Sequence, residues 1–482
     1  MIDLRPVGYV IGLLVAALGV AMAVPLAVDL NSGNGHWPAF LQSMAITLLT
    51  GLLMALASSN SVGDRLTIQQ TFLLTTSVWV ALPLFGALPF VLGATGASVT
   101  DALFEAMSGL TTTGSTVFTD LQTLPRGLLL WRSMLQWFGG IGIIVVAMVF
   151  LPELRVGGMQ IFRSEAFETM GKILPRAAEI AAQISWIYVG LTFLCFLGYV
   201  ALGMTSFDAI NHALTTLSTG GFSTTDASFG AFQGPPEYLA SVFMVLASLP
   251  FVRYVQLLAG SGRPLWRDSQ VRAFVTVILI VAVVLMAFQV LFDRRGIEES
   301  FREALFNVTS IISGTGYASV DYQLWGSFAM VVFFMLGLVG GCAGSTCCSV
   351  KIFRYQILLS SVRAQIRRIH APHGLFTPRF EGRPVTEDAL SSVMAFFVLF
   401  IVSLGILSVL LSLTGLDMIT AISGAATAIG NIGPGLGDRI GPAGNFATLN
   451  ATAKWLLIAG MLVGRLEIMA VYVIFTASFW RT

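Results

Sequence analysis

Four short glycine-bearing segments recur along this chain, each after a stretch of helix-forming residues and each before a long apolar run. The segments are Thr111–Ser115, Ser218–Phe222, Ser313–Tyr317 and Gly430–Gly435. By subtraction of their positions, the spacings are 106, 96 and 117 residues between Gly114, Gly220, Gly316 and Gly433. These spacings are similar to one another and much longer than a solenoid repeat. The sequence therefore predicts four copies of one structural unit in a single chain.

Composition places these units in a membrane. Hydrophobic residues make up 56% of the chain and charged residues only 11%, whereas a soluble domain carries roughly 25% charged residues. The net charge of +1 argues against a nucleic-acid partner, because such partners select strongly basic surfaces. We therefore expect an integral membrane protein whose main partner is the lipid bilayer.

Ten apolar runs are long enough to cross the hydrocarbon core, which takes about 20 helical residues. They cover residues 8–29, 37–58, 70–93, 130–151, 183–204, 238–259, 272–292, 327–350, 390–413 and 453–478. The first run is longer than a signal-peptide core and lacks a convincing cleavage site, so it is interpreted as a membrane helix. An even number of spans puts both termini on one side. That side carries 18 of the 26 basic residues against 7 on the other, with Arg465 inside a span, so both termini are expected to be cytoplasmic.

With this orientation every glycine segment lies on the outer side, after a stretch too short to cross the membrane. These stretches cover residues 101–112, 207–217, 301–312 and 417–429. Each has an acidic residue near its start, which suits the positive end of a helix dipole. These residues are Asp101, Asp208, Glu303 and Asp417. The predicted unit is a span, a re-entrant half-helix, a tight loop and a second span.

Backbone that leaves a helix at membrane depth must line water or be buried in protein, because lipid cannot bond its amides and carbonyls. Four such loops around one axis would point carbonyl oxygens inward in place of the hydration shell of a cation. Glycine suits these loops because it adopts dihedral angles that a side chain forbids. The pattern therefore predicts conduction of a dehydrated monovalent cation.

Several motifs, taken in order, resemble the Trk/Ktr/HKT superfamily of potassium transporters. They are Thr111-Thr112-Thr113-Gly114, Ser218-Thr219-Gly220-Gly221-Phe222-Ser223, residues 340–346 (GGCAGST), residues 431–437 (NIGPGLG) and Gly464-Arg465-Leu466-Glu467. The resemblance covers essentially the whole chain. Two spans precede the first unit, and the chain has 482 residues, so it resembles the bacterial TrkH type rather than the shorter KtrB type.

The resemblance implies an all-α polytopic membrane protein with four tandem helix–pore-helix–helix repeats around a pseudo-fourfold pore. The expected division is an N-terminal two-helix extension (1–67) and pore repeats at 68–180, 181–268, 269–387 and 388–482. It also implies a potassium-binding selectivity filter, which would pass rubidium as well. Its expected residues are Thr112, Thr113, Gly114, Ser218, Thr219, Gly220, Gly314, Thr315, Gly316, Asn431, Ile432 and Gly433.

A second cluster of small residues, Gly337–Ser349, lies 10 to 20 residues into the second span of the third repeat. So many small residues weaken a helix; close helix packing is the alternative reading of the pattern. The resemblance implies an intramembrane gating loop at Gly340, Gly341, Gly344, Ser345 and Thr346, with Arg465 of the last span beside it. A buried arginine costs about 2.5–3.5 kcal/mol on insertion scales, so Arg465 is expected to face the protein interior.

The chain contains no Walker or dinucleotide-binding motif, so we expect no bound cofactor, and potassium is the transported ion. The resemblance implies a homodimer in the bacterial cytoplasmic membrane. The dimer would dock on a cytosolic TrkA-type regulatory ring that binds adenine nucleotides and NAD(H). Two alternatives stay open at this point. A proton- or sodium-coupled potassium symporter would normally have carboxylates or histidines at the midplane, and a membrane enzyme would need a clustered acid, base or metal set.

Overall fold

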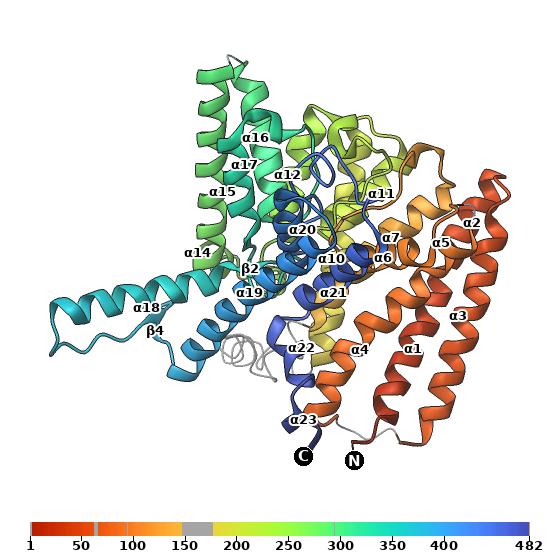
Figure 1. Ribbon diagram of the computed structural model, residues 1–482, viewed down its shortest axis with the longest axis horizontal. Coiled ribbons are helices and arrows are strands. Elements are labelled where there is room, and N and C mark those ends of the chain that lie inside the picture. The colour runs from red at the N-terminus through yellow and green to blue at the C-terminus, as the bar shows by residue number, and fades with distance from the viewer. Residues whose placement is uncertain (1, 62–65, 94, 147–176, 294, 482) are drawn as a thin grey trace.

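The computed structural model describes residues 2–61, 66–93, 95–146, 177–293 and 295–481 (Figure 1). Seven helices in these ranges are long and apolar enough to cross a membrane, and two bent helix pairs raise the number to nine. The seven are α1–α2 (Arg5–Ala21 and Ala23–Ser32), α3 (Trp37–Ser58), α4–α5 (Ile68–Gly86 and Leu88–Leu92), α7 (Arg126–Val145), α10 (Ala177–Ala201), α15 (Ser269–Phe288) and α19 (Glu387–Leu413). Both termini lie at one end of the molecule, called here the terminal side (Figure 1).

Three of the ten expected spans are not continuous helices. The span expected at 238–259 is divided into α12 (Pro235–Ala247) and α13 (Phe251–Leu258), which meet at 90°. Pro250 lies in this break, where its missing N–H cannot continue the helix. The last span is bent by 108° between α21 (Ala451–Arg465) and α22 (Ile468–Ile474). The span expected at 327–350 is helical only in α17 (Ser327–Gly337).

Four half-helices occupy the positions predicted for re-entrant segments. They are α6 (Val99–Leu110), α11 (Ser206–Leu217), α16 (Ile297–Ile312) and α20 (Met418–Gly430). Three of them, α6, α11 and α20, begin with a capping residue whose side chain accepts a hydrogen bond from a backbone N–H of the first turn. The capping residues are Ser98, Thr205 and Asp417. Such caps satisfy donors that no helical carbonyl reaches.

The third half-helix differs from its prediction. It begins at Ile297 rather than near residue 301, and the acidic residues of its first turn are Glu298 and Glu299. Glu303 is therefore not at the helix start, and it pairs with Arg295 at 2.9 Å.

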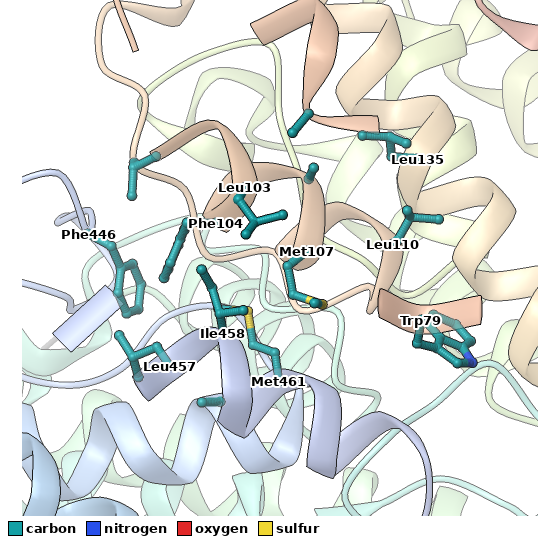
Figure 2. Close-up of a cluster of buried hydrophobic side chains, with 14 of the residues drawn as sticks. Trp79, Leu103, Phe104, Met107, Leu110, Leu135, Phe446, Leu457, Ile458 and Met461 are labelled. Carbon is teal, nitrogen blue, oxygen red and sulfur yellow. The ribbon is translucent and has the colours of Figure 1, made fainter. Parts of the chain in front are cut away.

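The four half-helices form a closed circle. Each packs between spans of its own repeat, and each repeat also contacts the next, through α7 with α11, α12 with α16, α17 with α20, and α21 with α6. The contact of α21 with α6 joins the last repeat to the first. Figure 2 shows this contact, with Phe104 and Met107 of α6 beside Ile458 and Met461 of α21. This arrangement confirms the all-helical polytopic fold.

The N-terminal helices α1 and α3 pack closely against each other at Gly12 and Gly51, where an added Cβ would lie within 3.0 Å of the other helix backbone. The shorter elements are η1 (Ser59–Ser61), η2 (Leu121–Thr123), η4 (Ser228–Phe232), α14 (Arg263–Arg267), the π-helical η5 (Gln289–Asp293), η6 (Tyr322–Trp325), β1 (Val339–Gly340), β2 (Val350–Lys351), α18 (Ile352–His370), β3 (Arg379–Phe380), β4 (Arg383–Pro384) and α23 (Ala477–Arg481). The exact repeat boundaries stay predictions. Residues 147–176 of the expected first repeat (68–180) lie outside the described residues.

Candidate functional site

The four glycine loops, residues 111–115, 218–222, 313–317 and 430–434, share one backbone pattern. Each loop has two residues with a positive φ, separated by one residue. The first of them directly follows the helix C-cap in the first three loops and is itself the C-cap in the fourth. The first positions are Thr112 (52°), Thr219 (50°), Gly314 (75°) and Asn431 (50°), and the second are Gly114 (86°), Gly221 (77°), Gly316 (79°) and Gly433 (103°). Between them lies a residue whose N–H bonds to the carbonyl five residues back, and these residues are Thr113, Gly220, Thr315 and Ile432. The loops are therefore structurally equivalent.

This pattern corrects the alignment of the second loop by one residue. Gly221, rather than Gly220, has the positive φ that matches Gly114, Gly316 and Gly433. Gly220 matches Thr113 instead. Two adjacent glycines made both alignments possible in the sequence, and the backbone distinguishes them.

The second-position glycines close the ring of loops. A Cβ on each of them would lie within 3.0 Å of a carbonyl oxygen in the next loop, closer than real Cβ atoms come. The pairs are Gly114 with Gly220, Gly221 with Thr315, Gly316 with Ile432, and Gly433 with Thr113. Each carbonyl belongs to the residue just before the next equivalent glycine. Glycine at these four positions therefore lets the four backbones meet around one axis.

The ring opens into a cavity of about 120 Å³ on the side from which the chain leaves the loops. All four second-position glycines line this cavity, together with Arg132. Most loop residues are buried, with Thr112 and Thr113 at 0% exposure, whereas Gly114 and Gly316 are partly exposed. The structure thus brings together all twelve residues predicted for the filter.

Side chains hold the loops at this ring. Gln136 of α7 spans the second loop, donating to the Gly220 carbonyl at 2.6 Å and accepting from the Phe222 N–H at 3.0 Å. Ser115 donates to the Gly433 carbonyl at 2.8 Å. Asn431 donates to the Thr113 hydroxyl at 2.9 Å, and so ties the fourth loop to the first.

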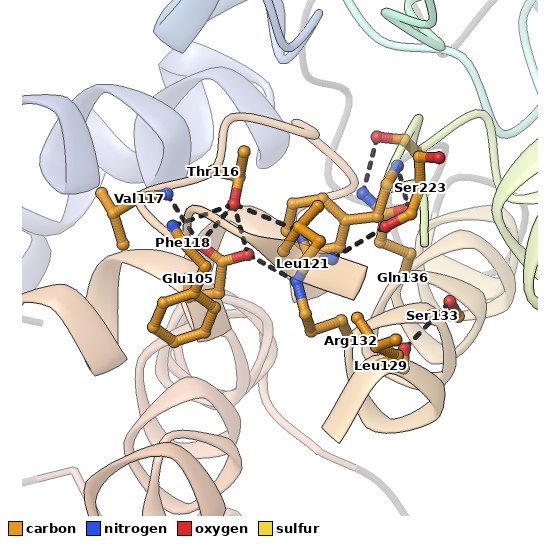
Figure 3. A network of polar contacts seen from close by, with 12 residues as sticks. Glu105, Thr116, Val117, Phe118, Leu121, Leu129, Arg132, Ser133, Gln136 and Ser223 are labelled. Carbon is orange, nitrogen blue, oxygen red and sulfur yellow. Dashed lines mark hydrogen bonds and ion pairs between the residues drawn. The ribbon is translucent and has the colours of Figure 1, made fainter. Parts of the chain in front are cut away.

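A buried ion pair lies beside the cavity (Figure 3). Glu105 of α6 and Arg132 of α7 are 2.8 Å apart, with side chains 0% and 1% exposed. Glu105 also accepts from the Thr116 hydroxyl at 2.9 Å and the Val117 N–H at 2.9 Å. Arg132 donates to the Ser223 carbonyl at 2.9 Å. The pair therefore connects the chain that leaves the first loop with the chain that leaves the second.

Sequence reasoning missed Glu105, Arg132 and Gln136. A usable signal was present, because Arg132 and Gln136 are polar residues four positions apart in an apolar helix and so share one face. Polar residues within a span are costly unless they bond to protein partners.

The intramembrane loop, residues 338–351, lies on the terminal side of the ring. Its ends pair as the parallel strands β1 and β2, with Gly340 opposite Lys351. Near its tip, the hydroxyl of Thr346 is 3.2 Å from that of Thr219, and the Cys348 sulfur is 4.0 Å from the Thr112 hydroxyl. Ser349 donates to the Gly430 carbonyl at 3.2 Å. The loop therefore contacts three of the four half-helix ends directly beneath the ring.

Most of the anchors of this loop come from the break between α12 and α13. The Cys342 N–H donates to the Ser248 carbonyl at 3.1 Å, and the Phe251 N–H donates to the Gly344 carbonyl at 3.0 Å. The Thr346 hydroxyl donates to the Ala247 carbonyl at 3.0 Å. The bend in this span thus supplies backbone groups that a continuous helix would use internally.

Arg465 is buried, at 3% exposure, and reaches the intramembrane loop from the end of α21. Its guanidinium donates to the Thr346 carbonyl at 3.4 Å and to the Cys348 sulfur. It also donates to the Gly139 carbonyl of α7 at 2.9 Å. The expected position of Arg465 beside the small-residue loop is thus what the structure shows.

Glu467 pairs with Arg354 and not with the nearby Arg465. Its carboxylate binds Arg354 at 2.5 Å, at the start of α18, and its backbone has a positive φ of 59° in the break before α22. Arg354 is 1% exposed and stacks 3.7 Å from the Phe396 ring centroid. This pair, which sequence reasoning did not identify, fixes the chain that leaves the intramembrane loop.

The oxygen atoms that the ring offers as ligands are backbone carbonyls and threonine or serine hydroxyls. Such neutral oxygens suit a weakly hydrated monovalent cation. Within the described ranges, no three His, Cys, Asp or Glu side chains form a group that could hold a metal ion. Zinc and similar metals prefer such nitrogen, sulfur and carboxylate ligands.

Comparison with known proteins agrees with this geometry. Residues 36–482 match the TrkH family, described as cation transport proteins. The potassium uptake protein TrkI of Halomonas elongata is 44% identical over 99% of this chain and 97% of its own length. The potassium uptake protein TrkH of Escherichia coli is 35% identical over 99% of both chains. The crystal structure of the potassium transporter TrkH from Vibrio parahaemolyticus superimposes with a TM-score of 0.91, at 32% identity over the full length of both chains.

Proposed function

Because this chain belongs to the TrkH family of cation transport proteins, we propose that it takes up potassium through the ring of four glycine loops. The carbonyls around the ring would replace the hydration shell of the ion. The half-helices end at the ring, so their negative dipole ends would lower the energy of a cation there. The ring closure between the second-position glycines and the neighbouring carbonyls is the observation that carries this proposal.

The intramembrane loop is proposed as the gate of this pathway. It lies beneath the ring and bonds to the half-helix ends through residues that Arg465 also contacts. A positive guanidinium at this depth would repel an approaching cation and would also hold the loop in place. Opening would then require movement of α21 or of the break between α12 and α13.

Dimer formation and regulation are proposed through α18. This helix points away from the bundle (Figure 1) and carries exposed apolar residues at helical spacing, Leu359, Val362, Ile366 and Ile369. We assign this stripe to a second copy of the chain, because an exposed apolar stripe of this kind is typical of a helix that packs against a partner. We also propose control by a cytosolic TrkA-type ring that binds adenine nucleotides and NAD(H), as the resemblance to this family implies. On the same ground we propose a multi-pass location in the bacterial cytoplasmic membrane, with the terminal side facing the cytoplasm.

Cation flux into liposomes containing only this chain tests the proposed transport. Potassium, rubidium, sodium and lithium would be compared with and without a pH gradient. We expect potassium and rubidium to enter faster than sodium and lithium, independently of the gradient. Potassium entry that requires the proton gradient, or a sodium gradient, would instead establish a coupled symporter.

A further inference from the structure

A cavity of about 510 Å³ lies between the N-terminal helices and the pore repeats. Its walls come mainly from α1, α4 and α7, through residues such as Leu14, Val78, Trp79, Phe138 and Gly142. Protein interiors rarely leave voids larger than a water molecule. A space of this size between packed helices therefore suggests an occupant.

The chemistry of the walls selects hydrocarbon. The two hydroxyls among the lining residues are both used within their own helices. Thr75 donates to the Thr71 carbonyl at 2.7 Å, and Ser185 donates to the Ala181 carbonyl at 2.8 Å. Buried water needs two to four polar partners, whereas beside these two hydroxyls the described lining side chains offer a single donor, the indole N–H of Trp79. Leu14 is 39% exposed, and it belongs to a helix suited to cross the membrane. The cavity is thus reached from the lipid.

The cavity shares its wall with the proposed gate. The Trp79 ring lies on one side of it, and the Arg465 guanidinium carbon is 5.3 Å from the centre of that ring. Gly139, which also lines the cavity, accepts the hydrogen bond from Arg465 through its carbonyl. Two of the groups that position Arg465 therefore contact whatever fills the cavity.

We propose that this cavity binds one acyl chain of a membrane phospholipid, and that the bound chain holds Trp79 and Arg465 against the intramembrane loop. The binding part stands by itself. The effect on the gate rests on the proposed function.

Gly142→Leu tests the binding part, because an added Cβ there meets only the Trp79 ring, at 3.9 Å, and the side chain would enter the cavity. Gly190→Leu is the matched control, since it lies on α10 with nothing within 4 Å of its Cβ. Ala17→Phe fills the cavity from α1 and serves as a second variant if Gly142→Leu does not fold.

The probe is a phosphatidylethanolamine with a photoreactive diazirine in its acyl chain, reconstituted with the full chain, and the labelled peptides are identified by mass spectrometry. In the parent and in Gly190→Leu we expect labels on the segments around Trp79 and Gly142. Gly142→Leu should reduce them about tenfold, because its side chain displaces roughly two methylene groups of the ligand. Equal labelling of the Gly142→Leu and Gly190→Leu proteins would overturn the site. So would the absence of labels on the segments around Trp79 and Gly142 in the parent.

Rubidium flux in the same liposomes tests the effect on the gate. Trp79→Leu keeps the wall apolar but removes the ring beside Arg465, so flux should rise by about threefold while labelling persists. Unchanged flux in Trp79→Leu would overturn the coupling. If no variant conducts any cation while labelling follows the expected pattern, the proposed transport function fails but the lipid site stands.

Discussion

The glycine-loop ring and the intramembrane loop face each other across the centre of the molecule, yet they are held in different ways. The ring is closed by four equivalent backbone contacts, one from each glycine loop to the next. In the part of the chain that the structure describes, the intramembrane loop occurs in one repeat, and it is anchored by backbone groups of the α12–α13 break and by Arg465 of α21. Its position therefore depends on elements of other repeats.

This difference supports the proposal that the ring provides a constant selectivity and the intramembrane loop a variable conductance. Shifting the ring would strain four mutually packed backbones, and a packed interior resists such displacement. Releasing the loop requires that its separate hydrogen bonds to α21 and to the α12–α13 break be broken, and each of these has a modest net strength. Substitutions in the two regions should therefore act in opposite directions on flux.

The largest effect is expected in the ring. Gly221→Ala combines an unfavourable φ with a clash against the Thr315 carbonyl, and strain of about 1–3 kcal/mol corresponds to roughly a 5- to 150-fold loss of rubidium flux. Gly405→Ala, in open space on α19, is the control. Gly220→Ala should be milder, because its closest neighbours belong to the Gln136 side chain. Greater damage from Gly220→Ala than from Gly221→Ala would contradict the corrected alignment.

The next effect has the opposite sign. Arg465→Ala removes the bonds to Thr346 and Cys348, so basal flux without a regulatory partner should rise about tenfold, since a hydrogen bond to a charged group contributes about 1.5–3 kcal/mol. Deletion of residues 340–349 should raise flux further. Arg481→Ala, at the exposed end of α23, should leave flux unchanged. If neither Arg465→Ala nor the deletion conducts faster than the parent, the loop is not the gate.

A smaller effect is expected where the ring is supported from outside. Glu105→Gln keeps the side-chain shape but removes the charge that faces Arg132. The potassium-to-sodium permeability ratio, measured from reversal potentials, should fall a few-fold, and unfolding should become easier by about 1–3 kcal/mol. The control is Glu298→Gln, because the Glu298 side chain is 71% exposed and also faces an arginine, Arg302. If Glu105→Gln loses stability but keeps the potassium-to-sodium permeability ratio of the parent, the Glu105–Arg132 pair has a structural role alone.

The smallest effect is expected at the start of the first half-helix. Ser98→Ala removes the cap that accepts from the Asp101 N–H at 3.1 Å, which typically costs about 1 kcal/mol. Thermal unfolding in detergent should shift down slightly, while ion selectivity stays constant. Ser59→Ala, at an exposed helix end, provides the comparison. A clear change in selectivity would show that the half-helix start also determines the ring geometry.

Much of this architecture could be predicted because it depends on local properties of the chain. Apolar runs locate the spans, and small residues locate the four glycine loops and the intramembrane loop, where backbone leaves a helix within the membrane. The breaks after Ala247 and Arg465 were missed, because both lie in apolar runs whose length alone suggests a continuous helix. There, hydrogen bonds from the intramembrane loop to Ala247 and Ser248, and the Glu467–Arg354 pair, satisfy groups that a continuous helix would not present.

By itself, the sequence determined a membrane protein with four repeated units, each with a short half-helix and a glycine loop, and an arginine buried within the last span. The position of this arginine beside the small-residue loop was expected only from the resemblance to a known family. Composition, spacing and backbone freedom are properties of single segments, so they can be read without knowing the partners. Only the tertiary structure decided that Gly221 is the ring glycine of the second loop, that Gln136 clamps that loop, and that Glu105 pairs with Arg132. These features depend on which groups from distant segments come within hydrogen-bonding distance. Folding alone establishes those distances.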